Sequence, residues 1–545
     1  MAAHSTYPQS AYPVVQSSIR IGGPIHEENK KSWQAVLERY SAALAEAASE
    51  GKASSLERHI SRGQLLPRDR IALLLDTGSP FLEIGAFAGH NLKDSTPCAS
   101  MIGGIGLIHN RPCMILSHIP TQSGGAWNEY TVMKQNRLTA IATENDLPVV
   151  ALVQSAGVFL PYQFKVFHKG GQIFYDLSVR TQKGKPSCAV VFGSCTAGGA
   201  YHPALSDYSI FVKDQAQVFL AGPPLVKAAT GEVIGAEELG GAKVHAQLTG
   251  LADQMAEDEF DAIRKARDWV ASLNLSSLGF FSPITSLPPR HSAEDLISFI
   301  DPDIRKPFNM PEVLIRIVDD SRYLEFKPEY GSNLITAWAS IFGHRVGIIA
   351  NQIPVINPDE ASKGAQFIRM CNQQNTPIIF LQNVTGFMVG SKAEHAAIIK
   401  RGAQMVSAVS TSTVPHITLI MGASYGAGNY AMCGRSFHPR FLFTWPIGRC
   451  SVMGPEQLAG VMETVERTSA ASQGKVLDEE ALRAKTAGFR DEVQRDGEAY
   501  ATSAVLHDDG IIDPRDTREV LGFCLEVVRV PGVRGAEAHG ILARM

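Results

Sequence analysis

The two halves of this 545-residue sequence repeat each other at a constant spacing. Pro148 and Pro377 each precede an apolar run that ends in a glutamine and a glycine-containing turn, and the spacing is 377 − 148 = 229 residues. Pro186 and Pro415 precede a second pair of apolar runs at the same spacing, because 415 − 186 = 229. A repeat that keeps one register over this length predicts two copies of one domain.

Matches on both sides of these runs extend the repeat. Upstream, Asn110–Pro120 aligns with His344–Pro354 at a spacing of 344 − 110 = 234. Between Leu273 and Leu296, Ser, Pro and Gly accumulate, as is typical of a linker. We therefore predict an N-terminal extension over residues 1–30, an N-terminal domain over 31–285 and a C-terminal domain over 286–545. The shift of 229 also relates three identical pairs: Lys134 and Lys363, Gly199 and Gly428, Tyr201 and Tyr430.

Each copy has the pattern of an α/β layered domain. Short apolar runs bounded by Gly and Pro, such as Val149–Val153 and Ile378–Leu381, are typical of fully buried strands. Helical stretches, Tyr130–Asn145 and Ala361–Asn375, precede these runs at equivalent positions. In such domains, ligands gather where strands end and helices begin. The turns after the strands are therefore the candidate site.

Composition and charge argue against several classes of protein. The chain is 45% hydrophobic, which is enough for two sizeable cores. Its net charge of −4, from 50 basic and 54 acidic residues, creates no field that would attract nucleic acid or an anionic membrane. The longest apolar stretches are far shorter than the ~18 residues that a membrane span needs. We expect a soluble protein with no nucleic-acid or membrane partner.

The eight cysteines are scattered, with no Cys-x-x-Cys and no histidine at zinc-ligand spacing. They predict reduced intracellular thiols and no metal site. The first 26 residues contain no Asp or Glu and several Ser, as a mitochondrial presequence would, but only Arg20 is positively charged. The last three residues, Ala543-Arg544-Met545, are a loose variant of the peroxisomal signal, and a chance ending is the simpler interpretation.

Two turns rich in small residues, Ser194–Tyr201 and Ser424–Tyr430, follow the second apolar run of each copy. Small residues leave consecutive backbone N–H groups uncovered, and such groups can donate hydrogen bonds to the oxyanion of a thioester enolate. Glycines in these turns would equally permit tight packing of a helix on a strand. The presence of both turns at equivalent positions of the repeat favours a binding role.

Other catalytic patterns are missing from the sequence. There is no Gly-x-Ser-x-Gly elbow, no phosphate-binding loop and no His-Glu-x-x-His helix. Ser155 precedes Ala156-Gly157, but no histidine or aspartate can be paired with it from the sequence. The histidines in apolar surroundings, His245, His416 and His438, are typical of structural histidines. The sequence thus predicts a site built from backbone dipoles.

Seven segments of the chain have a pattern typical of one protein family: Phe159–Pro161, Gly193–Tyr201, Phe219–Glu232, Glu238–Ala242, Asn383–Gly390, Ser424–Arg435 and Ser451–Gly454. Through these segments, and from about Glu27 to its C-terminus, the chain resembles the carboxyltransferase (β) subunits of biotin-dependent acyl-CoA carboxylases. Within that family, its Asn-Val-Thr-Gly-Phe and Gly-Ala-Gly-Asn-Tyr turns are similar to those of the methylcrotonyl-CoA and geranyl-CoA carboxylase branch.

This resemblance implies a fold, an activity and partners. The family fold consists of two tandem crotonase-like (ClpP/crotonase) domains, in agreement with the repeat. The implied reaction moves a carboxyl group from carboxybiotin to an acyl-CoA, here a branched or unsaturated one. The chain lacks an Ala-Met-Lys-Met attachment motif, so biotin would arrive on a biotin carboxylase/biotin carrier α subunit. The family also implies a homo-oligomer, a hexamer of β subunits, and the mitochondrial matrix, with the cytosol or the peroxisome as alternatives.

The resemblance also assigns roles to residues. In the family, the active site lies between the N-domain of one subunit and the C-domain of another. The amides of Gly198 and Gly199 would hold the thioester oxyanion, and those of Ala427 and Gly428 the ureido oxygen of biotin. The acyl-CoA, with its coenzyme A, and the biotin would contact nine further residues: Ser155, Ala156, Gly157, Ala197, Ala200, Thr385, Gly386, Phe387 and Gly426.

Several departures from the family pattern fall near this site. Gln122-Ser123 replaces Val-Lys, Tyr162 replaces an arginine, Gln404 replaces a lysine and Lys243 replaces an aspartate. Because the oxyanion turns are intact, these changes predict the same chemistry on an altered acyl group. Two alternatives remain open: a decarboxylase or other crotonase-type acyl-CoA enzyme that does not use biotin, and an inactive scaffold subunit of a carboxylase complex.

Overall fold

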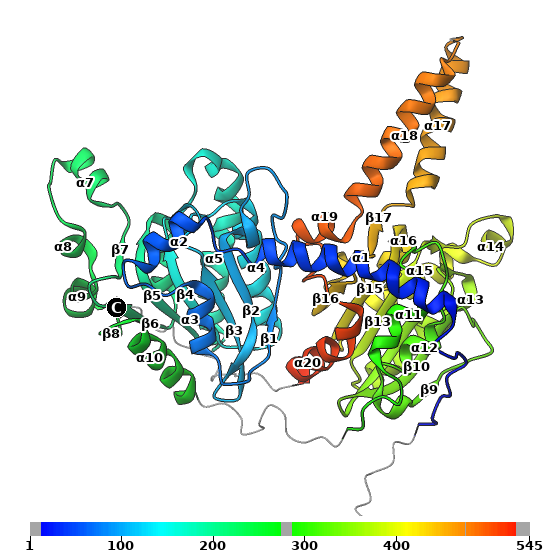
Figure 1. The fold of residues 1–545 in the computed structure, drawn as a ribbon, viewed down its shortest axis with the longest axis horizontal. Coiled ribbons are helices and arrows are strands. Elements are labelled where there is room, and N and C mark those ends of the chain that lie inside the picture. Colours follow the sequence, from blue (N-terminus) through cyan, green and yellow to red (C-terminus); the bar gives the residue numbers. More distant parts are fainter. Residues whose placement is uncertain (1–11, 274–285, 475, 530–545) are drawn as a thin grey trace, which may run out of the picture. The chain divides into compact units, whose positions relative to one another are not determined.

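The computed structural model describes residues 12–273, 286–474 and 476–529 (Figure 1). Their contacts divide the chain into two compact units. The N-unit contains residues 42–273, 504–506 and 529, and the C-unit contains residues 12–41, 286–503 and 507–528. The predicted boundaries at residues 30 and 285 stay predictions. The C-terminal signal, residues 1–11 of the N-terminal one and half of the predicted linker lie outside the described residues.

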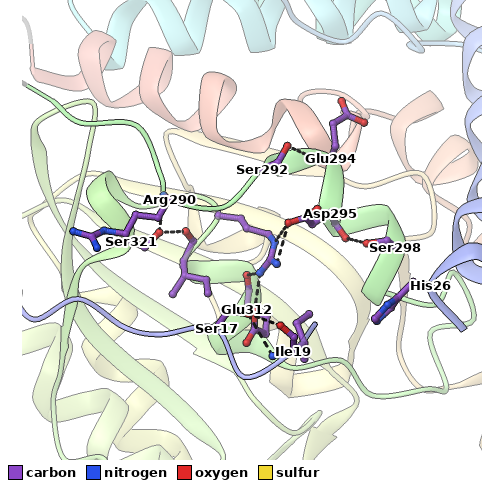
Figure 2. Close-up of polar contacts among 12 residues, drawn as sticks. Ser17, Ile19, His26, Arg290, Ser292, Glu294, Asp295, Ser298, Glu312 and Ser321 are labelled. Carbon is purple, nitrogen blue, oxygen red and sulfur yellow. Dashed lines mark hydrogen bonds and ion pairs between the residues drawn. The ribbon is translucent and has the colours of Figure 1, made fainter. Parts of the chain in front are cut away.

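Hydrogen bonds explain why the first described residues group with the C-unit. The carboxylate of buried Glu312 accepts bonds from the Ser17 hydroxyl at 2.8 Å and the Ser18 amide at 2.6 Å, and it pairs with Arg316 at 2.8 Å (Figure 2). Farther along, the Trp33 indole N–H on helix α1 (Pro24–Ala47) donates to the Ile300 carbonyl at 2.7 Å. These contacts attach the N-terminal segment through buried polar groups that would be costly to leave unpaired.

The N-unit is built on one sheet in the order β1-β2-β3-β4-β5-β6-β8, with β7 paired to β5. Strands β1 to β3 are antiparallel, and the strands from β3 onward pair in parallel. The bounds are β1 Phe81–Glu83, β2 Met101–Ile108, β3 Arg111–His118, β4 Val149–Ser155, β5 Ser187–Thr196, β6 Tyr208–Val212, β7 Gln217–Phe219 and β8 Gln254–Ala256.

The C-unit repeats this arrangement in the order β9-β10-β11-β13-β15-β16, with β17 paired to β15. A separate two-stranded sheet pairs β12 with β14 in parallel. The bounds are β9 Tyr323–Glu325, β10 Leu334–Ile341, β11 His344–Asn351, β12 Val355–Ile356, β13 Ile378–Val384, β14 Gly386–Phe387, β15 His416–Tyr425, β16 Phe441–Thr444 and β17 Arg449–Ser451.

Crossover helices connect the parallel strands, as such sheets require. In the C-unit, α17 and α18 form a long hairpin that projects from the rest of that unit (Figure 1). The principal N-unit helices are α2 Ala53–Ile60, α3 Pro67–Leu74, α4 Glu129–Glu144, α5 Gln163–Gln182, α6 Tyr201–Leu205, α7 Pro223–Thr230 and α10 Glu259–Ser272. Those of the C-unit are α13 Pro358–Gln373, α15 Ile398–Ser410, α16 Gly426–Ala431, α17 Pro455–Ser472, α18 Glu479–Asp496, α19 Ala499–Ala504 and α20 Thr517–Arg529.

The strand registers confirm the repeat and correct one of its spacings. Val149 and Ile378 open equivalent strands at 378 − 149 = 229 residues, as predicted. The predicted spacing of 234 for the preceding hairpin is wrong by one residue. Met114 pairs with Val149, and Gly347 pairs with Ile378, so the spacing there is 347 − 114 = 233. The spacing of 234 came from aligning similar side chains, whereas the pairing of the strands shows which residues of the two hairpins are equivalent. The predicted α/β fold of two tandem crotonase-like domains is confirmed.

Both sheets pack fully buried apolar strands against their helices. In the N-unit core, Ile115, Val150 and Val190 lie on adjacent strands and contact residues of α3 and α10. In the C-unit core, Ile349 and Phe380 pack against α13 and α15. All eight cysteines are free thiols. Within the described ranges, no helix is long and apolar enough to cross a membrane, and no cluster of metal-ligating side chains occurs.

Candidate active site

The first predicted turn follows strand β5. A short 3₁₀ helix over Ala197–Ala200 begins where the strand ends, and α6 continues from it. Ala197 has a φ of +51° and is exposed, Gly198 is half-buried and Gly199 is buried. The first amides of a helix have no acceptor within the helix. The Gly198 and Gly199 amides therefore lie in the first turn after β5, at the start of a helix.

The turn after β4 lies against this first turn. The Ser155 hydroxyl donates to the Gly125 carbonyl at 2.8 Å and accepts from the Gly157 amide at 3.1 Å. A Cβ on Gly157 would lie 2.8 Å from the Thr196 carbonyl oxygen, and a Cβ on Gly199 would lie 3.4 Å from the Ser155 carbonyl oxygen. Ser155 is fully buried and holds the turn with both of its bonds, so it is no nucleophile in this geometry.

Trp127 supports the same turn, and the sequence did not identify it. Its amide donates to the Gly157 carbonyl at 2.8 Å, and its ring lies 3.6 Å from where a Cβ on Gly198 would be. The indole N–H donates to Nε2 of His118 at 3.0 Å. Burial lowers the pKa of His118 to about 3, so this ring stays neutral and can accept the bond. The only sequence indication was the preceding Gly124-Gly125 pair.

The second predicted turn opens α16 in the C-unit. Gly426 has a φ of +54°, Ala427 is exposed and Gly428 is buried. A Cβ on Gly428 would lie only 2.7 Å from Cγ2 of Val384 and 3.0 Å from Cα of Gly386. The contact with Val384 is closer than real Cβ atoms show and the contact with Gly386 is tighter than nine in ten of them, so any side chain at position 428 requires its neighbours to shift. The start of α16 is thus packed directly on the end of β13.

Thr385, Gly386 and Phe387 continue from β13 and are held by a neighbouring segment. The Thr385 amide and hydroxyl both donate to the Pro354 carbonyl, at 2.6 and 2.7 Å. Gly386 and Phe387 then pair in parallel with Val355 and Ile356. The structure therefore brings Gly386 against Gly428, as it brings Ser155 against Gly199 in the other unit.

A cavity of about 480 Å³ in the C-unit adjoins the second turn. Its lining includes Gly426 and Ala427, which the sequence identified as site residues, and Arg435, His507 and Asp508, which it did not. The other lining residues are Ile420, Asn429, Tyr430, Ser436, Leu442, Thr444, Cys450, Ser451, Val452 and Thr502.

The residues that depart from the family pattern differ in exposure. Gln122 is buried, and its side-chain amide donates to the Ser49 carbonyl at 2.8 Å. Tyr162 donates its hydroxyl to Asp94 at 2.5 Å. Lys243 and Gln404 are exposed. Gln122, at the position of the valine, therefore points into the protein, whereas Ser123, at the position of the lysine, is exposed.

Comparison with known proteins matches the chain over most of its length. A family model described as "Carboxyl transferase domain" matches residues 58–534. The biotin-dependent 3-methylcrotonyl-coenzyme A carboxylase beta1 subunit of Mycobacterium tuberculosis is 46% identical over 89% of this chain and 92% of its own length. The mitochondrial methylcrotonoyl-CoA carboxylase beta chain of Arabidopsis thaliana is 44% identical over 91% of this chain and 86% of its own.

A solved structure agrees with these sequence matches. The β subunit of P. aeruginosa geranyl-CoA carboxylase superposes with a TM-score of 0.90 at 38% identity. The alignment covers 98% of this chain and all of that subunit. The fold of this chain is therefore shared with that β subunit.

Proposed function

This chain belongs to the carboxyl transferase domain family, and from that premise we propose that it transfers a carboxyl group from carboxybiotin to an acyl-CoA. The observation that carries the proposal is the duplicated turn. In each unit, a buried strand ends in small residues that open a helix, and a second turn packs against that helix start. One enzyme with two such turns can hold two developing oxyanions, as a transfer between two carbonyl compounds requires.

The roles of the turns follow from their hydrogen-bond donors. The Gly198 and Gly199 amides stabilise the enolate oxygen of the thioester, and the Ala427 and Gly428 amides bind the ureido oxygen. Each such donor contributes about 3–4 kcal/mol to the transition state. When bound, carboxybiotin supplies the carboxyl group and a ureido nitrogen that can accept the substrate proton. The cavity beside Ala427 offers biotin both apolar walls and polar groups.

The remaining predicted contacts line the two turns. Ser155, Ala156 and Gly157 shape the acyl side together with Ala197 and Ala200. Thr385, Gly386, Phe387 and Gly426 shape the biotin side. Ser155 acts by fixing Gly157, since its hydroxyl is already engaged on both sides.

The proposal includes partners that this chain does not contain. Biotin is carried by a biotin carboxylase/biotin carrier α subunit, because the relatives are named as biotin-dependent β subunits and this sequence lacks an attachment motif. The chain itself assembles as a homo-oligomer, a hexamer of β subunits. Helix α5 supports the assembly, because Phe164 and Phe167 are 83% and 70% exposed there and Leu160 just before it is 77% exposed. Such an exposed apolar patch is typical of an interface.

We further propose that the acyl group differs from methylcrotonyl. The departures at Gln122-Ser123 and Tyr162 fall in the N-unit, which would receive the acyl-CoA. On the biotin side, the segments Asn383–Gly390 and Ser424–Arg435 keep the pattern of the methylcrotonyl and geranyl branch, although Gln404 replaces a lysine in the C-unit. Biotin use is therefore retained, while acyl selectivity is shifted towards a longer or more polar chain.

A panel of acyl-CoA thioesters, assayed with the reconstituted biotin partner, tests this substrate proposal. A change of one or two methylenes in an apolar pocket alters selectivity by about 10–200-fold, so residual methylcrotonyl-CoA activity should remain detectable. The expected result is a higher kcat/KM for another branched or unsaturated thioester. A clear preference for methylcrotonyl-CoA over every other thioester would contradict it. Turnover of no thioester would favour the scaffold alternative, and decarboxylation without biotin the crotonase-type alternative.

A further inference from the structure

One of the residues that line the cavity beside the second turn is a buried carboxylate. Asp508 is 1% exposed, and its Oδ2 accepts a hydrogen bond from the Thr444 hydroxyl at 2.9 Å. Its other oxygen, Oδ1, is buried and has no partner at normal hydrogen-bond geometry among the described residues, although the Ser503 hydroxyl also approaches this carboxylate as a donor. Because a carboxylate has about four lone-pair sites, Asp508 can still accept a further hydrogen bond, and it is among the residues that line the cavity.

Arg435 provides a donor at the wall of the same cavity. Its Nε donates to the His507 carbonyl at 3.2 Å, and its Nη2 pairs with Asp509 at 2.8 Å. Its Nη1 is buried and donates to no atom within the described residues. Asp509 is fixed in turn, because its Oδ2 accepts from the Leu442 amide at 2.8 Å. The guanidinium is thus held rigidly, with one N–H group still available.

Buried polar groups without partners are rare, and each one needs an explanation. Here Asp508, which can accept a further hydrogen bond, and Arg435, whose Nη1 donates none within the described residues, are both among the residues that line one cavity of about 480 Å³. The remaining walls include the apolar side chains of Ile420, Leu442 and Val452. This combination suits a compact, mostly apolar ligand that presents both an N–H group and a carbonyl oxygen.

A ureido ring has this chemistry. It presents one carbonyl oxygen and, on its nitrogens, N–H donors that need acceptors. The amides of Ala427 and Gly428 can only donate, so they can satisfy the carbonyl oxygen but not an N–H group. Ala427 and Asp508 are both among the residues that line this cavity. The missing acceptor is therefore available beside the turn that would bind the carbonyl.

We propose that Asp508 is a ureido-binding residue, whose Oδ1 accepts a hydrogen bond from a ring N–H while Arg435 keeps the Asp508-Asp509 segment in place. This inference rests on the proposed function, because it concerns the biotin side of that reaction. Burial raises the pKa of Asp508 to about 6, which leaves its side chain ionised, and acceptor-only, at neutral pH. Of the titratable neighbours, burial lowers the pKa of His507 and raises that of Cys450 to about 11, so both are neutral at that pH.

Two substitutions at this position test the proposal in the full-length oligomer. Asp508→Asn keeps the shape, so it should fold, and replaces one acceptor oxygen with a donor. Asp508→Ala removes both acceptors. The matched control is Asp513→Asn, which removes a charge from another buried carboxylate of the C-unit that is not among the residues lining the cavity. The probe is biocytin, which accepts the carboxyl group from a carboxylated acyl-CoA in the reverse reaction.

The measurement compares the KM for biocytin with the KM for the carboxylated acyl-CoA in each variant. We expect the KM for biocytin to rise about 10-fold or more in both Asp508 variants, as the loss of a hydrogen bond to a charged group implies, while the KM for the carboxylated acyl-CoA stays unchanged. Asp513→Asn should leave both values unchanged. Unchanged biocytin KM in both Asp508 variants, or an equal rise of both KM values, would overturn the proposal.

A binding measurement separates this inference from the proposed function. If the unmodified chain transfers no carboxyl group, the proposed function fails, but biocytin binding can still be measured by ligand-observed NMR. Weaker binding to folded Asp508→Asn than to the unmodified chain would support the ureido-binding role. Equal binding to both proteins, or no binding to either, would exclude it.

Discussion

Replacing Gly428 by alanine is expected to reduce carboxyl transfer about 100–1,000-fold, the effect of losing one oxyanion-hole donor. The added Cβ would lie 2.7 Å from Cγ2 of Val384 and 3.0 Å from Cα of Gly386. The Val384 side chain could rotate away, but the Gly386 backbone cannot move without breaking its pairing with β12. The start of α16 must therefore shift, and the Gly428 amide moves with it. The measurement is kcat for transfer to biocytin.

A glycine in open space provides the control for this variant. Gly460 lies within helix α17, and a Cβ there would meet no atom within 4 Å. Gly460→Ala should therefore keep full activity and, through its better helix propensity, gain up to about 1 kcal/mol of stability. Full transfer activity in folded Gly428→Ala would show that the α16 amides are not part of the site.

Replacing Gly199 by valine is expected to abolish transfer on the acyl side without unfolding the chain. A Cβ at this position would lie 3.4 Å from the Ser155 carbonyl oxygen and 3.5 Å from Ser155 Cβ, which is ordinary contact. The backbone can therefore tolerate a side chain. The γ-methyl groups of valine would extend into the space that the thioester must occupy, and kcat/KM for acyl-CoA should fall at least about 100-fold.

The Gly199→Ala variant shows whether the valine side chain acts by blocking the thioester site or by unfolding the protein. Its single methyl group fits, so this variant should retain more activity than Gly199→Val, and circular dichroism should show both proteins folded. Biocytin binding should remain unchanged in both, because the C-unit is not altered. Undiminished transfer by the valine variant would remove Gly199 from the site.

The sequence predicted those parts of the fold that depend on local pattern. The apolar runs after Pro148 and Pro377 became β4 and β13, because continuous apolar residues between glycine and proline are typical of buried parallel strands. The stretches Tyr130–Asn145 and Ala361–Asn375 became α4 and α13 with small shifts at their ends. The glycine turns could be identified because small residues leave backbone N–H groups uncovered, and this property depends on residue type rather than on tertiary contacts.

Contacts between distant segments could not be predicted in this way. Trp127 and His118 meet through a hydrogen bond between a loop and the end of β3, and nothing in their spacing predicts that contact. Asp508 and Thr444 are brought together only by the packing of the chain after α19 against β16. The hairpin spacing of 233 rather than 234 depends on strand pairing, which similar side chains do not determine.

The central claim is that this chain itself moves a carboxyl group between an acyl-CoA and biotin. The most direct measurement incubates the purified chain, without any partner, with acyl-CoA thioesters carrying a ¹⁴C-labelled carboxyl group and with biocytin. The account predicts label on biocytin with at least one branched or unsaturated thioester, and loss of that transfer in both Gly199→Val and Gly428→Ala. Label that never reaches biocytin with any thioester, although the oligomer is folded and binds acyl-CoA, would contradict the account.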